Sequence, residues 1–461
     1  MRKIGRGFGI GKGTGDAVNG KFRIAFLLLV LEAAFGGFYV TISRSITPIF
    51  LVTLGFTLKD LLMLSAFAGL LSLLVALTLY RNGHRSKNIK HMLGASLLVE
   101  RVFWFLIPFT VGDVNLLVLS YSLAIALTIP SNIYMNIALF TFFSEAAFRR
   151  IIAYRTTAGS VASIIAQITI VSTLALGRGV EKYLLLYSVA FLVGLVSVIS
   201  IGLAPISKSM KDYESKKVEE SEIHANNIYL LLVMLLTSTN LLGIAWIPRL
   251  MRDLGAPDYL AASIGFVQTL TNIFASLFWV NKSVKSYRYA IPMLGTVPLL
   301  VLVIPIPYAH LGIAALHSFS LLGANFYASI GYANLVRNLG VVKAGILLPS
   351  ANALAMMLAG VVGYLLVQSP ILVFTMASMF SLLGLLIAFI ALPELAIVPP
   401  NYMRMYSRIL YMSSITSYNF IMLTVSETAK AVLRFTGLIL GIMILLVIYR
   451  TIYYIMMLTG G

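Results

Sequence analysis

Residues 61–79 read LLMLSAFAGLLSLLVALTL, a run that holds no charged side chain. A helix needs about 20 apolar residues to cross the hydrocarbon core of a bilayer. The run shows no strict apolar/polar alternation, and the same is true of residues 184–203, so neither fits a strand of a membrane barrel. Each stretch predicts a membrane-spanning α-helix.

Composition extends this prediction to the whole chain. Of its 461 residues, 59% are hydrophobic and only 11% are charged, whereas soluble domains carry about 25% charged residues. The net charge of +18 is spread over short segments between apolar runs, which argues against a nucleic-acid partner. The absence of cysteine excludes disulfides and thiolate metal sites, and no cofactor is expected. We therefore predict an all-α, polytopic protein whose surroundings are the lipid bilayer.

A criterion of about 20 apolar residues per span divides the chain into two sets of six spans. A basic tail (1–23) precedes an amino-terminal bundle (24–204), and a polar linker (205–227) leads to a carboxy-terminal bundle (228–392). The expected spans are Ile24–Ser43, Leu58–Tyr80, His91–Thr110, Val114–Phe140, Thr156–Leu176, Tyr183–Leu203, Ile228–Ile247, Leu260–Val280, Tyr289–Pro305, Leu311–Ala333, Ala344–Val367 and Ile371–Leu392.

Charged residues in the loops predict the orientation. Through the twelfth span, 22 Lys and Arg fall on the side of the amino terminus and 6 on the opposite side. Because cytoplasmic loops carry the excess of Lys and Arg, the amino terminus and the linker are expected in the cytoplasm. We expect a multi-pass protein of the cell membrane.

The two sets of spans repeat. Leu54-Gly55 precedes the second span and Leu254-Gly255 precedes the eighth, while Met92-Leu93-Gly94 opens the third span and Met293-Leu294-Gly295 opens the ninth. The shared register indicates tandem six-helix halves in the same orientation. It also makes the first apolar run a permanent helix, rather than a cleaved signal peptide.

The chain resembles the major facilitator superfamily over Phe22 to Leu392. The resemblance rests on this topology and on three local features: Thr47-Pro48-Ile49-Phe50, Arg149-Arg150 with Arg155, and the loop Tyr80-Arg81-Asn82-Gly83-His84-Arg85. In that loop Arg81, Gly83 and Arg85 fit the family's signature, but Tyr80 replaces its acidic residue. The resemblance implies a secondary transporter whose helices one, four, seven and ten line the cavity, with helix three peripheral.

The carboxy-terminal extension (393–461) leaves this pattern. Residues 432–449 are long and apolar enough for a thirteenth span. Residues 409–425 mix apolar side chains with Ser, Thr and Asn, which favours an interfacial segment over a span.

Ionisable residues inside spans are costly and predict function. Glu32 lies in the first span, while Glu100 and Arg101 lie in the third. On its cavity helix, Glu32 is the candidate for a proton or substrate-cation site. The structural alternative is an ion pair between Glu32 and Arg101, and Glu100 with Arg101 is a further candidate charge pair.

Polar side chains on three other cavity helices form the rest of the expected site. Thr128, Asn132 and Asn136 recur at every fourth position and so share one helix face. This face is either a substrate surface or a contact between helices. The proton-titrating His317 is either functional or a hydrogen-bonded packing residue. The remaining candidates are Asn240, Asn325 and Tyr327.

These residues predict a carrier for a small polar or amphipathic solute, neutral or cationic, with proton coupling through Glu32. Clustered mid-membrane Arg and Lys would suit an anion, and only Arg101 was assigned there. The alternatives are a sensor or a lipid flippase on the same fold and, more remotely, a membrane-embedded enzyme. Acidic residues of the outer loops are scattered singly and so do not form an enzyme's paired carboxylates.

Overall fold

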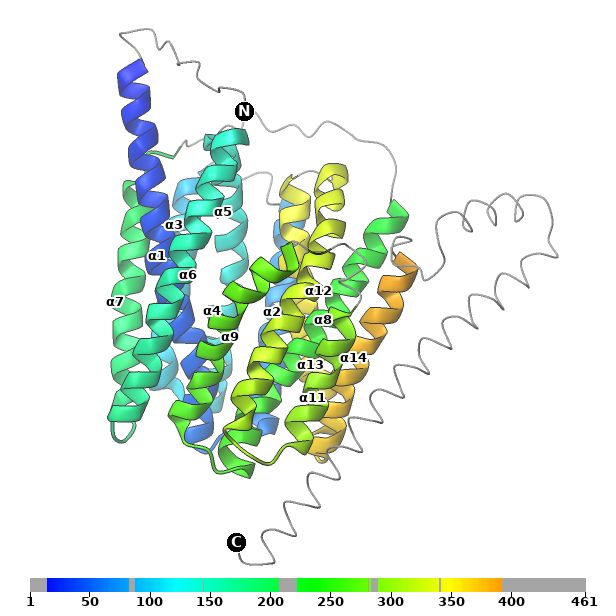
Figure 1. Ribbon diagram of the computed structural model, residues 1–461. Coiled ribbons are helices and arrows are strands. Elements are labelled where there is room, and N and C mark those ends of the chain that lie inside the picture. The colour runs from blue at the N-terminus through cyan, green and yellow to red at the C-terminus, as the bar shows by residue number, and fades with distance from the viewer. Residues whose placement is uncertain are drawn as a thin grey trace, which may run out of the picture.

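A computed structural model describes residues 15–82, 88–143, 145–206, 222–280, 282, 289–339 and 341–391. All regular secondary structure within these ranges is helical, and the helices run side by side in one bundle (Figure 1). The predicted thirteenth span, the segment 409–425 and most of the linker lie outside the described residues.

Two sets of helices correspond to the two predicted halves. The first half contains α1 (Gly15–Thr53), α2 (Leu58–Asn82), α3 (Ile89–Thr110), α4 (Val114–Ala126), α5 (Thr128–Phe142), α6 (Glu145–Leu176) and α7 (Glu181–Leu203). The second half contains α8 (Glu222–Pro248), the π-helical turn η2 (Arg249–Asp253), α9 (Asp258–Val280), α11 (Ala290–Val303), α12 (Ala309–Leu339), α13 (Val341–Leu366) and α14 (Pro370–Ala391).

The fourth span is one helix interrupted in the middle. It is divided into α4 and α5 at Leu127. Pro130 lacks a backbone N–H and cannot donate to the carbonyl of Ala126, four residues earlier. The interruption of this span thus falls just before Pro130. With α4 and α5 counted as one span, the predicted fold class of two six-helix halves is confirmed.

The halves pack their helices in equivalent ways. In the first half α1 contacts α6 and α7, and α3 contacts α4 and α7; in the second, α8 contacts α13 and α14, and α11 contacts α12 and α14. Gly55 and Gly255, the glycines of the sequence repeat, have positive φ angles of 99° and 64°. Glycine adopts this conformation without the steric cost that a Cβ imposes. The repeated Leu-Gly pairs thus mark equivalent turns.

Most helices are suited to a bilayer. Ten helical segments in the described part of the chain are long and apolar enough to cross a membrane. Many large apolar side chains stay exposed, among them Leu176, Leu192 and Phe274. Exposed apolar area on this scale suits contact with lipid rather than water.

Close backbone contacts join the two halves of the bundle. We call the end with Arg81, Lys90 and Arg150 the basic end, and the opposite end, with Gly55, Gly179 and Gly255, the far end. The halves meet along α2 with α13 and along α6 with α9. A Cβ on Gly69 would lie 2.3 Å from the backbone N of Met357, and one on Gly360 would lie 2.4 Å from that of Ala66. Glycine therefore permits direct backbone contact between α2 and α13, in the half of α2 nearer the far end.

Polar contacts also join the halves at the far end. Lys182 Nζ lies 2.5 Å from Asp258 Oδ2, and the hydroxyl of Tyr183 donates to the same oxygen over 2.8 Å. The Thr53 and Tyr183 hydroxyls share a 3.0 Å hydrogen bond. Asp258 begins α9, whereas Thr53, Lys182 and Tyr183 belong to the first half. This far-end cluster of Thr53, Lys182, Tyr183 and Asp258 holds the halves together there.

We expect Gly360→Ala to destabilise this arrangement, because the added methyl group cannot fit against the backbone of Ala66. Overpacking of this kind costs about 1–3 kcal/mol. Thermal unfolding of the purified protein should show a midpoint lowered by several degrees.

Gly94→Ala is the matched control, since a Cβ on Gly94 meets nothing within 4 Å. Alanine also favours helix over glycine, so this variant should unfold at an unchanged or slightly higher temperature. Equal stability of the two variants would contradict the close approach of α2 and α13.

Candidate functional site

A cavity of about 410 Å³ lies within the first half, between α1, α3, α5 and α6. Its wall reaches from Thr128, where α5 begins, to Leu139 near the basic end of the same helix. The far-end cluster and the α2–α13 contact lie on the other side of the bundle's middle. The cavity thus occupies the basic-end half.

Glu32 lines this cavity and is paired with Arg155. Its Oε2 lies 2.6 Å from Nη1 of Arg155, and both side chains are largely buried. The same Nη1 donates a 2.7 Å hydrogen bond to the carbonyl of Leu29, so its contact with Glu32 is ionic rather than a well-aligned hydrogen bond. The expected pair between Glu32 and Arg101 is therefore wrong. Arg155, assigned from sequence to a basic loop, lies inside α6 and reaches α1 instead.

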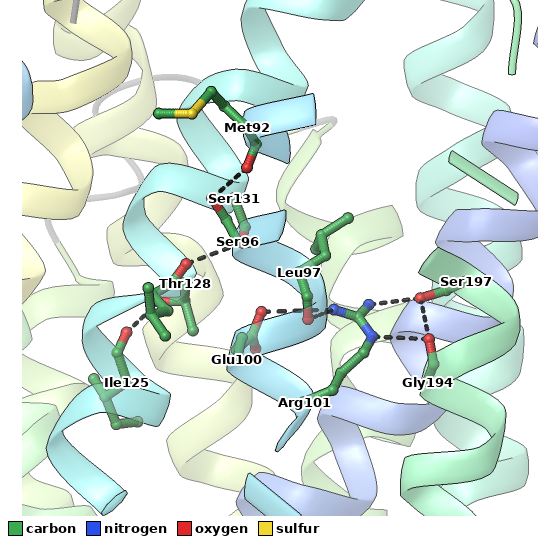
Figure 2. A network of polar contacts seen from close by, with 11 residues as sticks. Met92, Ser96, Leu97, Glu100, Arg101, Ile125, Thr128, Ser131, Gly194 and Ser197 are labelled. Carbon is green, nitrogen blue, oxygen red and sulfur yellow. Dashed lines mark hydrogen bonds and ion pairs between the residues drawn. The ribbon is translucent and has the colours of Figure 1, made fainter. Parts of the chain in front are cut away.

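Arg101 reaches toward Gly194 and Ser197 of α7 (Figure 2). Its Nε donates to the carbonyl of Gly194 over 2.8 Å, Nη1 to that of Leu97 over 2.7 Å, and Nη2 to Ser197 Oγ over 2.5 Å. The guanidinium also stacks 4.7 Å from the ring centre of Tyr39. These contacts satisfy a buried cation, which would otherwise be costly.

Gly194 makes room for this guanidinium. A Cβ at Gly194 would lie 2.9 Å from the Tyr39 ring and 3.2 Å from the Arg101 side chain. A larger residue would push the guanidinium off its acceptors on α7. The position of Arg101 therefore depends on a residue more than ninety positions later in the chain.

Glu100 has far weaker contacts than its neighbour. It is only 3% exposed, and the nearest cationic atom is Arg101 Nη1, at 3.8 Å. Within the described part of the chain it accepts no hydrogen bond. Its side chain lines the cavity, so α3 is not peripheral as the family resemblance implied. The candidate pair Glu100–Arg101 is a loose contact, because the guanidinium is held elsewhere.

Arg44 also lines the cavity, contrary to its sequence assignment to an outer loop. The first span was expected to end at Ser43, but α1 continues to Thr53 without a break, through Pro48. Arg44 is therefore one helical position of a longer span. It is exposed, and it has no hydrogen bond or ion pair with any residue that the structure describes.

The polar face predicted on the fourth span lies on the cavity wall. Thr128, Asn132 and Asn136 all contribute to it, together with Ser131. Both asparagines are exposed, while Thr128 and Ser131 donate to the backbone carbonyls of Ile125 and Leu127. The asparagine amides are thus the neutral polar groups of this wall that remain available to a solute.

Candidates from the second half do not join this cavity. His317 is buried, with Nδ1 3.1 Å from Nε2 of Gln268, and its ring packs edge-on against Trp246. Asn240 and Asn325 are half-buried on α8 and α12. Arg81 is exposed at the basic end, whereas Gly83, Arg85 and the side chain of Tyr327 lie outside the described residues.

Sequence reasoning missed Arg44, Arg155 and Ser131 as members of the wall. For Arg44 the sequence holds no clear signal, because twelve residues after Glu32 in a continuous α1 correspond to a rotation of about 120° and a rise of about 18 Å. Ser131 adjoins the predicted stripe. The sequence holds no signal for Arg155, because its contact with Glu32 joins residues far apart in the chain.

We expect Arg101→Lys to destabilise the protein, because a single ammonium cannot reach the three separate acceptors. Losing hydrogen bonds of a buried charged group costs about 1.5–3 kcal/mol each. The measurement is the thermal midpoint in detergent. The control is Arg81→Lys, the same change at an exposed position, which should leave the midpoint unaltered. Equal midpoints would show that the α7 contacts of Arg101 add no stability.

Comparisons with known proteins find similarity of structure alone. No protein-family model matches the sequence, and no curated protein does. A nucleoside transporter, NupG, superposes with a TM-score of 0.56 at 12% identity, covering 80% of this chain and 98% of that one. A bacterial homologue of the iron transporter ferroportin, in an inward-facing state, superposes with a TM-score of 0.59 at 14% identity, covering 80% of this chain and 98% of that one.

A third solved structure carries the family name. The major facilitator superfamily transporter FucP, in its outward conformation, superposes with a TM-score of 0.52 at 10% identity, covering 81% of this chain and 99% of that one. Nearly the full length of each neighbour is matched, with both six-helix halves. The chain therefore has the fold of the major facilitator superfamily.

Proposed function

We propose that this protein is a secondary carrier that moves a small polar or amphipathic solute across the cell membrane by alternating access. The observation that carries this proposal is a cavity lined by charged and polar side chains within one of two equivalent six-helix halves, which are joined at the far end by an ion pair. Alternating access needs two such halves that can change their contacts.

Two further observations support the proposal. NupG, FucP and the ferroportin homologue are named for transport or for homology to a transporter. The excess of basic residues on the side of the amino terminus favours a cytoplasmic location for the basic end. With that orientation, the far-end cluster would face the outside of the cell.

The experiment uses thiol labelling to measure whether the far end is closed. The chain contains no cysteine, so Ser65→Cys supplies the only thiol. Ser65 is buried where α2 meets α13, and it donates to the carbonyl of Met356. Adding Asp258→Asn removes the ion pair with Lys182 from the far-end cluster. A membrane-impermeant maleimide applied at the far side should then react about tenfold faster, a shift of about 1.4 kcal/mol.

Asp253→Asn is the matched control, because Asp253 pairs with Arg249 four residues away in the same half. Its labelling rate should equal that of Ser65→Cys alone. A cargo, sought among neutral, cationic and anionic solutes by flux into proteoliposomes, should change the labelling rate of Ser65→Cys alone. A far end that labels alike in all variants, with or without solute, would favour a sensor over a carrier.

Proton coupling through Glu32 remains part of the proposal. The charged carboxylate of Glu32 can pair with Arg155, and the protonated group can release it. If the pair forms in only one facing state, the two states differ in their affinity for a proton. Glu32→Gln imitates the protonated form at nearly constant volume. We expect gradient-driven accumulation of the cargo to be lost in proteoliposomes, while exchange of cargo across the membrane survives.

Glu181→Gln is the control for this variant, since Glu181 is exposed at the far end. It should accumulate cargo as the parent does. Full accumulation by Glu32→Gln would make Glu32 a structural partner of Arg155, with no part in coupling.

A further inference from the structure

The charged side chains on the cavity wall differ in how fully other groups of the protein neutralise them or hydrogen-bond to them. Two carboxylates, Glu32 and Glu100, and three guanidiniums, Arg44, Arg101 and Arg155, line it. Glu32 and Arg155 neutralise each other at 2.6 Å. Arg101 is held by Gly194, Leu97 and Ser197. This leaves one anion and one cation whose charges the described protein does not satisfy.

The anion is Glu100. Its carboxylate is buried, yet among the described residues it has only the 3.8 Å contact with Arg101, whose donors are aimed at other acceptors. A buried carboxylate without hydrogen-bond donors is costly. Because this one borders the cavity, a cationic group placed there could supply the missing donors.

The cation is Arg44, on α1. Its side chain is exposed, and no group within the described ranges pairs with it. A guanidinium binds a carboxylate through two parallel hydrogen bonds. Arg44 and Glu100 line the same cavity of about 410 Å³. The cavity thus presents an unused anion and an unused cation on one wall, from α3 and α1.

We infer that the cargo of this cavity is a small zwitterion, whose ammonium group binds Glu100 and whose carboxylate binds Arg44. A volume of about 410 Å³ leaves room for an amino acid or a short peptide. The exposed amides of Asn132 and Asn136 offer neutral hydrogen bonds to the rest of the molecule. The inference rests on the proposed function only in taking the cavity as the cargo site.

Binding to the purified full chain in lipid nanodiscs tests the inference without any need for flux. The probes are leucine and leucyl-leucine, as zwitterions, and two derivatives that each lack one charge: leucine methyl ester and N-acetyl-leucine. We expect at least one zwitterion to bind at least about tenfold more tightly than either derivative, since each lost charged hydrogen bond costs that much or more.

Two variants should shift this preference in opposite directions. Arg44→Gln should weaken zwitterion binding about tenfold or more while leaving the methyl ester unaffected. Glu100→Gln should weaken the zwitterion similarly and leave N-acetyl-leucine unaffected. A structural role for either residue would weaken all probes alike. The control is Arg178→Gln, a change at an exposed position outside the cavity wall, which should bind as the parent does.

The outcomes separate the inference from the proposed function. Failure of every probe to bind, or equal binding of the zwitterions and the singly charged derivatives, overturns the inference. Should Glu100→Gln fail to fold, Arg44→Gln alone decides, because loss of discrimination between leucine and its methyl ester is specific to that position. Zwitterion binding without transport in proteoliposomes would uphold the inference and refute the carrier. Transport of an uncharged solute without zwitterion binding would do the reverse.

Discussion

The guanidinium of Arg101 is a cation almost completely removed from solvent, and such a group is tolerated only when its donors meet acceptors. Its acceptors come from α3 itself and from α7, and the ring of Tyr39 on α1 covers its face. One side chain thus fixes three helices relative to one another. Because two of its hydrogen bonds go to α7 (Figure 2), the adjacent Glu100, which lines the cavity, has only a loose contact with it. The charges that remain available on the cavity wall therefore depend on the hydrogen bonds of Arg101.

The two halves repeat one architecture but differ in chemistry. Charged side chains line the cavity of the first half. The buried polar residues of the second half are mostly neutral, such as His317, Ser318 and Ser381. Contact between the halves includes glycines that bring backbones together and the ion pair of Lys182 with Asp258, alongside a buried apolar cluster to which both halves contribute.

Much of the fold could be predicted from residue order because a bilayer imposes simple rules. Apolar runs of sufficient length must be helices there, and the repeated Leu-Gly pairs at Gly55 and Gly255 indicate two equivalent halves. Part of the site was predicted too. Helical periodicity alone places Thr128, Asn132 and Asn136 on one face, and the cost of burying a carboxylate singled out Glu32. These are local properties of one helix each.

Pairing of side chains between helices is not a local property, and the sequence alone did not predict it. Which arginine meets Glu32 depends on how α1 packs against α6, which brings residues 32 and 155 together. Whether Arg44 is in a loop or in a cavity depends on how far α1 continues past Pro48. The sequence by itself determined the helices, their repeat and the faces on which polar groups lie, since hydropathy and helical period act on neighbouring residues. Only the tertiary structure decided which charges neutralise one another and which remain for a solute, because that depends on distances between segments far apart in the chain.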